Sequence, residues 1–190
     1  MRILILLFFT AIVCKAQHPE DPTRGVKIYA LVTNTDTKKP VHYGSFEEMH
    51  ELDFNKINTV SIENRGNKTS MDTLLLKNLL NNAPNLTSFT IGRNVYLDRF
   101  PKIEKNNHLK ELYLTVNNLS QIPLDIDNLT ALELFECSGN KIQGLPDSFS
   151  NLKKLKTLIL KANNINIFPE EILSHQNLNV LWVKKKKKTI

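Results

Sequence analysis

The chain has 190 residues, of which 41% are apolar and 23% charged, which is ordinary for a globular protein and enough for one domain with a sizeable core. Its formal charge of +6 falls to +4 without Arg2 and Lys15, and to −1 without the five lysines from Lys184 to Lys188 as well, so the positive excess belongs to the two ends. This distribution argues against a basic nucleic-acid-binding face on the body of the chain.

The first residues have the features of a secretory signal peptide. Arg2 gives a positive start, residues 3–13 form an apolar run of eleven residues, and small residues precede a cleavage site after Ala16. Such a run is too short to cross about 30 Å of hydrocarbon as a helix. We therefore predict a signal peptide over residues 1–16 and a secreted or periplasmic protein, with an uncleaved anchor as the alternative. Cleavage would leave Cys137 as the single cysteine and no internal disulfide.

Three elements are predicted before the most regular part of the chain. Residues 26–32 are expected to form a strand and residues 45–54 a short helix, joined through a polar, turn-rich link at 34–40. Further on, residues 71–80 have the apolar spacing of an amphipathic helix of about ten residues. Ser70 or Asp72 would cap its start, and the segment 81–84, which ends in proline, would stop it.

From Leu86 onward the sequence repeats with a step of 23 residues. Each repeat has three apolar positions that match the inward side of a short strand, then an asparagine and a further apolar or aromatic residue. The four complete sets are Leu86, Phe89, Ile91, Asn94 and Tyr96; Leu109, Leu112, Leu114, Asn117 and Leu119; Leu132, Phe135, Cys137, Asn140 and Ile142; and Leu155, Leu158, Leu160, Asn163 and Ile165. Leu178, Leu181 and Val183 begin another repeat, which is incomplete.

This pattern, L-x-x-L-x-L-x-x-N-x-L followed by an apolar segment with a proline, resembles the leucine-rich repeat family in its common 23-residue form. The resemblance covers roughly residues 57–183, or about five to six repeats, although Arg65 stands where the first asparagine would be and the step from there to the next repeat is 29 residues. It implies an α/β fold, a right-handed solenoid with a curved parallel sheet, one strand per repeat, and an irregular or short-helical convex side. Residues 17–56 would then be the N-terminal linker and cap, and residues 184–190 a basic tail.

The repeated asparagines are predicted to be structural. They stand where each strand turns inward, so their amides can satisfy backbone groups that would otherwise be buried without partners. This set comprises Asn94, Asn117, Asn140 and Asn163.

The resemblance implies that a ligand binds on the concave face of the sheet, formed by the alternate strand residues that point away from the core. The early strands place small polar residues there, whereas the later strands place apolar and aromatic residues flanked by charges, which is typical of protein interfaces. The candidate partner-binding residues are Glu111, Tyr113, Leu134, Glu136, Ile159, Lys161, Val180 and Trp182. The alternative is that Val180 and Trp182 lie beneath a lost repeat or a terminal flap.

The sequence gives little support for catalysis. Its five histidines are scattered, Cys137 falls on an inward strand position, and neither a glycine-rich phosphate loop nor a G-x-S-x-G motif is found. We therefore predict no catalytic residues, no metal ligands and no cofactor, and a protein ligand as the partner. Contact of the lysines from Lys184 to Lys188 with a membrane or with nucleic acid is less favoured than a solvated tail.

Two alternatives to a secreted binding module stay open. In the first, the chain is a truncated remnant of a larger repeat protein, without a function of its own. In the second, it is an intracellular or membrane-tethered scaffold. The abrupt end after Val183 suggests truncation, a final edge protected by the charged lysines, or coverage by another chain.

Overall fold

The computed structural model describes residues 28–66, 68–92, 94–166, 170–173 and 175–183. The predicted signal peptide, Pro169 and the lysine run lie outside these residues. None of the described helices is long and apolar enough to cross a membrane.

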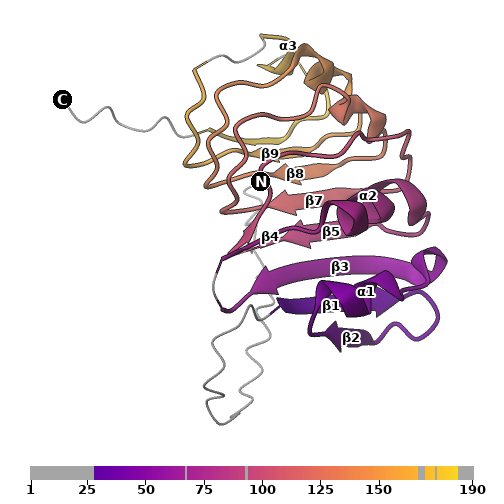
Figure 1. The fold of residues 1–190 in the computed structure, drawn as a ribbon. Coiled ribbons are helices and arrows are strands. Elements are labelled where there is room, and N and C mark those ends of the chain that lie inside the picture. The colour runs from indigo at the N-terminus through magenta and orange to yellow at the C-terminus, as the bar shows by residue number, and fades with distance from the viewer. Residues whose placement is uncertain (1–27, 67, 93, 167–169, 174, 184–190) are drawn as a thin grey trace, which may run out of the picture.

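The described part of the chain is a stack of coils that share one eight-stranded sheet (Figure 1). The strands follow one another along the sheet in the order β10-β9-β8-β7-β5-β3-β1-β2, so every new coil is added beside the previous one. The strands are β1 (Ile28–Asn34), β2 (Pro40–Tyr43), β3 (Ile57–Asn64), β5 (Ser88–Ile91), β7 (Glu111–Leu114), β8 (Leu134–Glu136), β9 (Thr157–Ile159) and β10 (Val180–Trp182). Those from β3 to β10 pair in parallel, which confirms the solenoid predicted from the repeat.

The repeat of the sequence sets the register of the sheet. Leu112 pairs with Phe135 and Phe135 with Leu158, each partner standing 23 residues later, so equivalent residues form rows across the strands. These three side chains are fully buried. Because neighbouring coils bury one another's apolar residues, the core runs along the whole stack rather than lying within any single coil.

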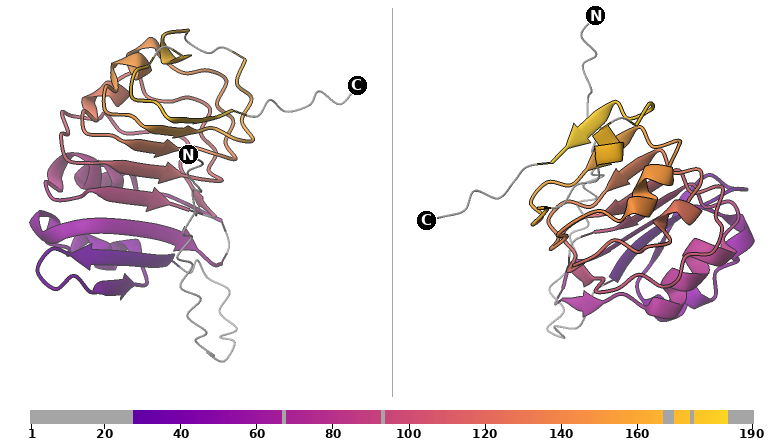
Figure 2. Two further views of the ribbon diagram at one scale, coloured as in Figure 1. Left: turned by 180° about the vertical axis from the view of Figure 1, so that it is seen from behind. Right: turned by 90° about the horizontal axis from the view of Figure 1, so that it is seen from above.

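Helices and 3₁₀ turns form the side of the coils opposite the strands (Figure 2). They are α2 (Thr73–Asn82), the 3₁₀ turns η2 (Ile126–Asn128) and η3 (Asp147–Asn151), and the short helix α3 (Glu170–Leu173). Ile126, Phe149 and Ile172 point inward from these segments and are at most 1% exposed. The ring of Phe149 packs on that of Phe135, with ring centroids 5.7 Å apart, and so joins the two sides of a coil.

Helix α2 forms close to where the sequence predicts it. Asp72 is its N-cap, and its carboxylate accepts a hydrogen bond from the Leu75 amide over 2.9 Å. The inward leucines of this helix are fully buried. The helix ends before Pro84, which has no amide hydrogen to continue it.

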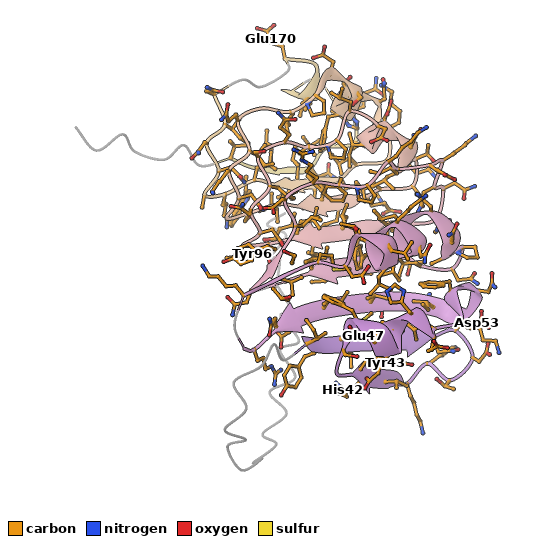
Figure 3. The ribbon with its side chains drawn as sticks, in the orientation of Figure 1. His42, Tyr43, Glu47, Asp53, Tyr96 and Glu170 are labelled. Carbon is orange, nitrogen blue, oxygen red and sulfur yellow. The ribbon has the colours of Figure 1, made fainter. Side chains whose placement is uncertain are left out.

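An antiparallel strand pair covers the N-terminal end of the parallel sheet. Strand β1 lies beside β3, in the place expected for a capping strand, and β2 lies outside β1. Figure 3 labels His42 and Tyr43 on this outermost strand. The predicted helix over residues 45–54 is shorter in the structure: α1 covers Phe46–His50, and a 3₁₀ turn, η1 (Phe54–Lys56), follows.

Three short strands were not predicted. Strand β2 has four residues that are exposed or half-buried, so no buried face marks it in the sequence. Strands β4 (Thr69–Ser70) and β6 (Val95–Tyr96) have two residues each and pair in parallel as a small second sheet. Elements of this length are too short to show a period.

In three of the four coils the repeated asparagine is buried and bonded to the backbone. Asn117, Asn140 and Asn163 are buried and donate hydrogen bonds to backbone carbonyls of the preceding coil, over 3.1, 2.7 and 2.7 Å. The side-chain oxygens of Asn140 and Asn163 also accept bonds from backbone amides of that coil. Each of these asparagines therefore connects two coils.

Asn94 departs from the pattern. It is half-buried, adopts a positive φ of 63°, and bonds the carbonyl of Asn64 over 3.2 Å. In the later coils the residue before the asparagine takes the positive φ instead, as at Val116, Gly139 and Ala162. The coil of β5 therefore turns by a different backbone route from the later coils.

Candidate binding face

The candidate residues lie in rows on the sheet face opposite the helices, called here the concave face. One row passes from Glu111 to Leu134 and Thr157 and ends at Val180. The second row contains Tyr113, Glu136, Ile159 and Trp182 in the same order of strands. Trp182 is 48% exposed and the others are half-buried, so all of these side chains reach the surface.

The register changes the composition expected for this face. Glu136 stands directly between Tyr113 and Ile159, and Thr157 stands between Leu134 and Val180. The apolar residues Tyr113, Leu134 and Ile159 of β7, β8 and β9 are therefore diagonal neighbours, at distances of about 7 to 8 Å. Ile159 and Trp182, by contrast, pair directly. A carboxylate lies within the apolar patch, not only beside it.

Tyr113 is held between two carboxylates. Its hydroxyl donates a hydrogen bond to Glu111 Oε2 over 3.4 Å, and the same oxygen accepts a bond from Ser88 Oγ over 3.0 Å. Burial raises the pKa of Tyr113 to about 12, with the negative charges of Glu111 and Glu136 acting in the same direction. The phenol is therefore neutral at physiological pH and acts as a hydrogen-bond donor.

Burial also raises the pKa of Glu136 above its ordinary value, although the nearby Ser138 hydroxyl and the charge of Lys161 act against this. The half-buried carboxylate has lost part of its hydration. A group that restores favourable contacts to its oxygens would stabilise the ionised form.

Lys161 lies two residues after the end of β9, beside β10. Its Nζ is 3.3 Å from the centroid of the Trp182 ring, which is a cation–π contact. The ammonium group covers part of the indole, and the remainder of the ring stays exposed at the end of the sheet.

The N-terminal half of the face has a different character. Residues such as Ser61 and Thr90 leave a shallow surface of small polar groups. Beyond it, Arg65 pairs with Glu63 over 2.8 Å and places its guanidinium 4.2 Å from the centroid of the Tyr29 ring.

Tyr29 lies ahead of the repeats and is not among the residues predicted for this face. The signal for it was the alternation of β1, because Ile28 and Ala30 are buried and the residue between them must face the other way.

Neither a metal site nor a reactive thiol is found on this face. No group of three or more metal-binding side chains occurs in the part of the chain that the structure describes. Cys137 is fully buried among the inward strand residues, and burial raises its pKa to about 12. Its thiol is therefore a core group, as the sequence predicts.

A comparison with known families agrees with this geometry, since residues 107–165 match the family model described as leucine rich repeat. The chain therefore contains leucine-rich repeats. The matched segment contains strands β7, β8 and β9 and thus most of the candidate face.

Several known leucine-rich-repeat proteins are similar to parts of the chain. Human PH domain leucine-rich repeat-containing protein phosphatase 1 is 34% identical over 71 residues, which are 37% of this chain and 4% of that protein. Human leucine-rich repeat and IQ domain-containing protein 4 is 40% identical over 65 residues, 34% of this chain and 12% of that protein. Disease resistance protein RPS4B of Arabidopsis thaliana is 32% identical over 102 residues, 53% and 8% of the two chains.

Among solved structures, the leucine-rich-repeat ectodomain of the receptor kinase SOBIR1 from Arabidopsis thaliana is 18% identical, with a TM-score of 0.47 over 87% of this chain and 80% of that one. The chain spans at most 12% of the length of the three curated relatives above. Leucine-rich repeats are protein-interaction modules, and this chain contains such a module.

Proposed function

We propose that the protein is a secreted, non-catalytic binding module that holds a protein ligand on the concave face between β7 and β10. The observation that carries this proposal is the set of side chains on that face. Four adjacent strands present two aromatic rings and two carboxylates on one surface, and Lys161, just after β9, adds an ammonium group.

Covering such a surface with a partner contributes favourable binding free energy. Tyrosine and tryptophan bury a large area while losing little conformational freedom, and they dominate the energetics of many interfaces. Trp182 is 48% exposed, and the Tyr113 hydroxyl is held by Glu111, so both rings are already placed for contact. The opposite side of the coils is taken up by helices and turns that cover the core.

Secretion is supported by the leader-like sequence of residues 1–16. Amino-terminal sequencing of the native protein tests it: a mature chain that starts at Gln17 supports secretion, and a chain that retains Met1 contradicts it.

We also propose that residues 17–56 cap the array of residues 57–183, and that residues 184–190 are a solvated basic tail.

The binding proposal is tested by removing both aromatic anchors. The wild-type chain is used to capture proteins from the extracellular medium of its source, and the captured protein is purified and bound again in isolation. We expect Tyr113→Ala combined with Trp182→Ala to abolish this binding while the far-ultraviolet circular dichroism stays unchanged.

Leu124→Ala is the matched control, because Leu124 is an 81% exposed apolar residue away from the strands. This variant should bind like the wild type. Undiminished binding by the double variant would move the site away from the concave face.

A further inference from the structure

Two carboxylates of the concave face, those of Glu111 and Glu136, form no ion pair among the described residues. The ion pairs of the described residues join His50 to Asp72, Lys56 to Asp36, Arg65 to Glu63 and Lys156 to Glu133. Neither Glu111 nor Glu136 takes part in one. The nearest lysine of the face, Lys161, lies over the Trp182 ring instead.

These carboxylates stand on two sides of an aromatic ring. Glu111 precedes Tyr113 by two residues on β7, and Glu136 is the residue paired with Tyr113 on β8. Strand spacing places the two paired residues about 5 Å apart. A cation at this point would meet two carboxylates and the phenol ring together, three contacts that each favour an ammonium or a guanidinium group.

An apolar surface follows at a fixed distance. Ile159 and Trp182 continue the same row on β9 and β10. By strand spacing, the midpoint of this apolar pair lies about 10 Å from the midpoint of Tyr113 and Glu136. An extended peptide advances about 3.3 Å per residue, so this distance corresponds to about three residues. The row therefore matches a segment that crosses the strands with a basic residue first and an apolar residue after it.

We propose that the ligand segment is a basic, extended peptide, with an arginine or lysine side chain between Glu111 and Glu136 against the Tyr113 ring and an apolar side chain about three residues away on Ile159 and Trp182. This inference rests on the proposed function and specifies its partner. An acidic or phosphate-bearing ligand is disfavoured, because it would meet two carboxylates that form no ion pair, and only one lysine.

The test uses a display library of random peptides of about twelve residues, selected on the immobilised full chain. The best-enriched peptide is then synthesised, and its affinity is measured by fluorescence anisotropy against the wild type and three variants. The variants are Glu111→Gln with Glu136→Gln, Tyr113→Ala with Trp182→Ala, and Glu104→Gln. The last removes an exposed glutamate beside α2, outside the concave face, and is the matched control for charge.

We expect the selected peptides to contain an arginine or lysine two to four residues from an apolar residue. The double glutamine variant should bind at least about tenfold more weakly than the wild type. Its binding should also depend less on the salt concentration, because it has lost the charge pairs with the peptide that salt screens. The Glu104→Gln chain should bind like the wild type.

Two other results separate this inference from the proposed function. Peptides that need Tyr113 and Trp182 but carry no basic residue would overturn the inference and leave the concave face as the binding site. Peptides that bind every variant equally well, or no enriched peptides at all, would contradict both.

Discussion

One asparagine and the residue before it determine how each later coil turns. Asn140 donates to the carbonyls of Leu114 and Cys137 over 2.7 and 3.1 Å and accepts from the Leu119 amide over 3.1 Å. The preceding residue, Gly139, has a positive φ of 72°. This backbone conformation is free of strain for glycine and costly for other residues.

Replacing Asn140 by alanine should lower the free energy of unfolding by ~1–3 kcal/mol, because backbone groups of two coils would be left buried without partners. Denaturant unfolding followed by circular dichroism measures the change. Asn164→Ala is the control, since Asn164 is exposed and should tolerate the substitution with little effect. A stability equal to that of the wild type for Asn140→Ala would contradict the structural role.

The sequence predicts these asparagines well because a strict 23-residue step aligns them. It does not predict Asn106, which is 1% exposed and bonds the Leu80 carbonyl and the amides of His108 and Leu109. The equivalent place in the next coil holds Leu129, its partner in an isolated bridge, so a comparison of repeats marks the position as apolar. A single polar exception carries no periodic signal.

Among the elements, α2 depends on one residue that serves two contacts. Asp72 caps the helix through the Leu75 amide and also lies 3.0 Å from His50 Nε2, at the end of α1. Burial alone would raise the pKa of Asp72, but the Leu75 hydrogen bond and the neighbouring His50 outweigh it, and the pKa is lowered below 3.8. The carboxylate therefore links the capping segment to the array.

Asp72→Ala should cost ~1 kcal/mol of stability at neutral pH through loss of the cap. A lowered native-state pKa means that the carboxylate stabilises the fold above pH 3.8 and that this contribution is lost as the pH falls through the native value. Unfolding curves of both chains between pH 7 and pH 2 should therefore converge at acid pH. Asp72→Asn keeps a capping oxygen and should retain most of the stability at pH 7, whereas a loss equal to that of alanine would argue against capping as the cause.

Long periodic elements were predictable and short ones were not. The spacing of the leucines in α2 predicts a helix over residues 71–80, and the alternation of apolar residues around Ala30 predicts β1. Strand β2 forms because the exposed edge of β1 offers it backbone hydrogen bonds, which leave no mark on its side chains. Strands β4 and β6 likewise form through backbone hydrogen bonds, here to each other, and their side chains show no pattern that predicts them.

At the scale of the whole molecule, the coils stabilise one another through a shared core. Phe135 is fully buried in β8 and packs on Phe149 from the far side of its coil. Its neighbours in the sheet, Leu112 and Leu158, belong to the coils on either side. No coil buries its apolar residues without the next.

Phe135→Ala should therefore cost ~3–5 kcal/mol and lower the stability of the whole array, not of one coil. Thermal unfolding followed by circular dichroism and by the fluorescence of Trp182, two coils away, should show both transitions shifted together. A shift confined to one probe would mean that the coils unfold independently.

The candidate face was predictable as a set of residues but not as a surface. The repeat identifies which side chains point away from the core, and so selects Tyr113, Ile159 and Trp182. The pairing of the strands then places Glu136 between the first two, in the register that the 23-residue step sets. The contact between Lys161 and Trp182 depends likewise on the three-dimensional arrangement.

Site-specific photo-crosslinking tests the concave face as the binding surface most directly. A photoreactive benzoylphenylalanine replaces Thr157, between Leu134 and Val180 on this face, or Leu124 outside the strands, and each full chain is irradiated with the protein that the wild type captures. We expect a covalent product from position 157 and none from position 124. Crosslinking from position 124 with none from position 157 would contradict the proposed site.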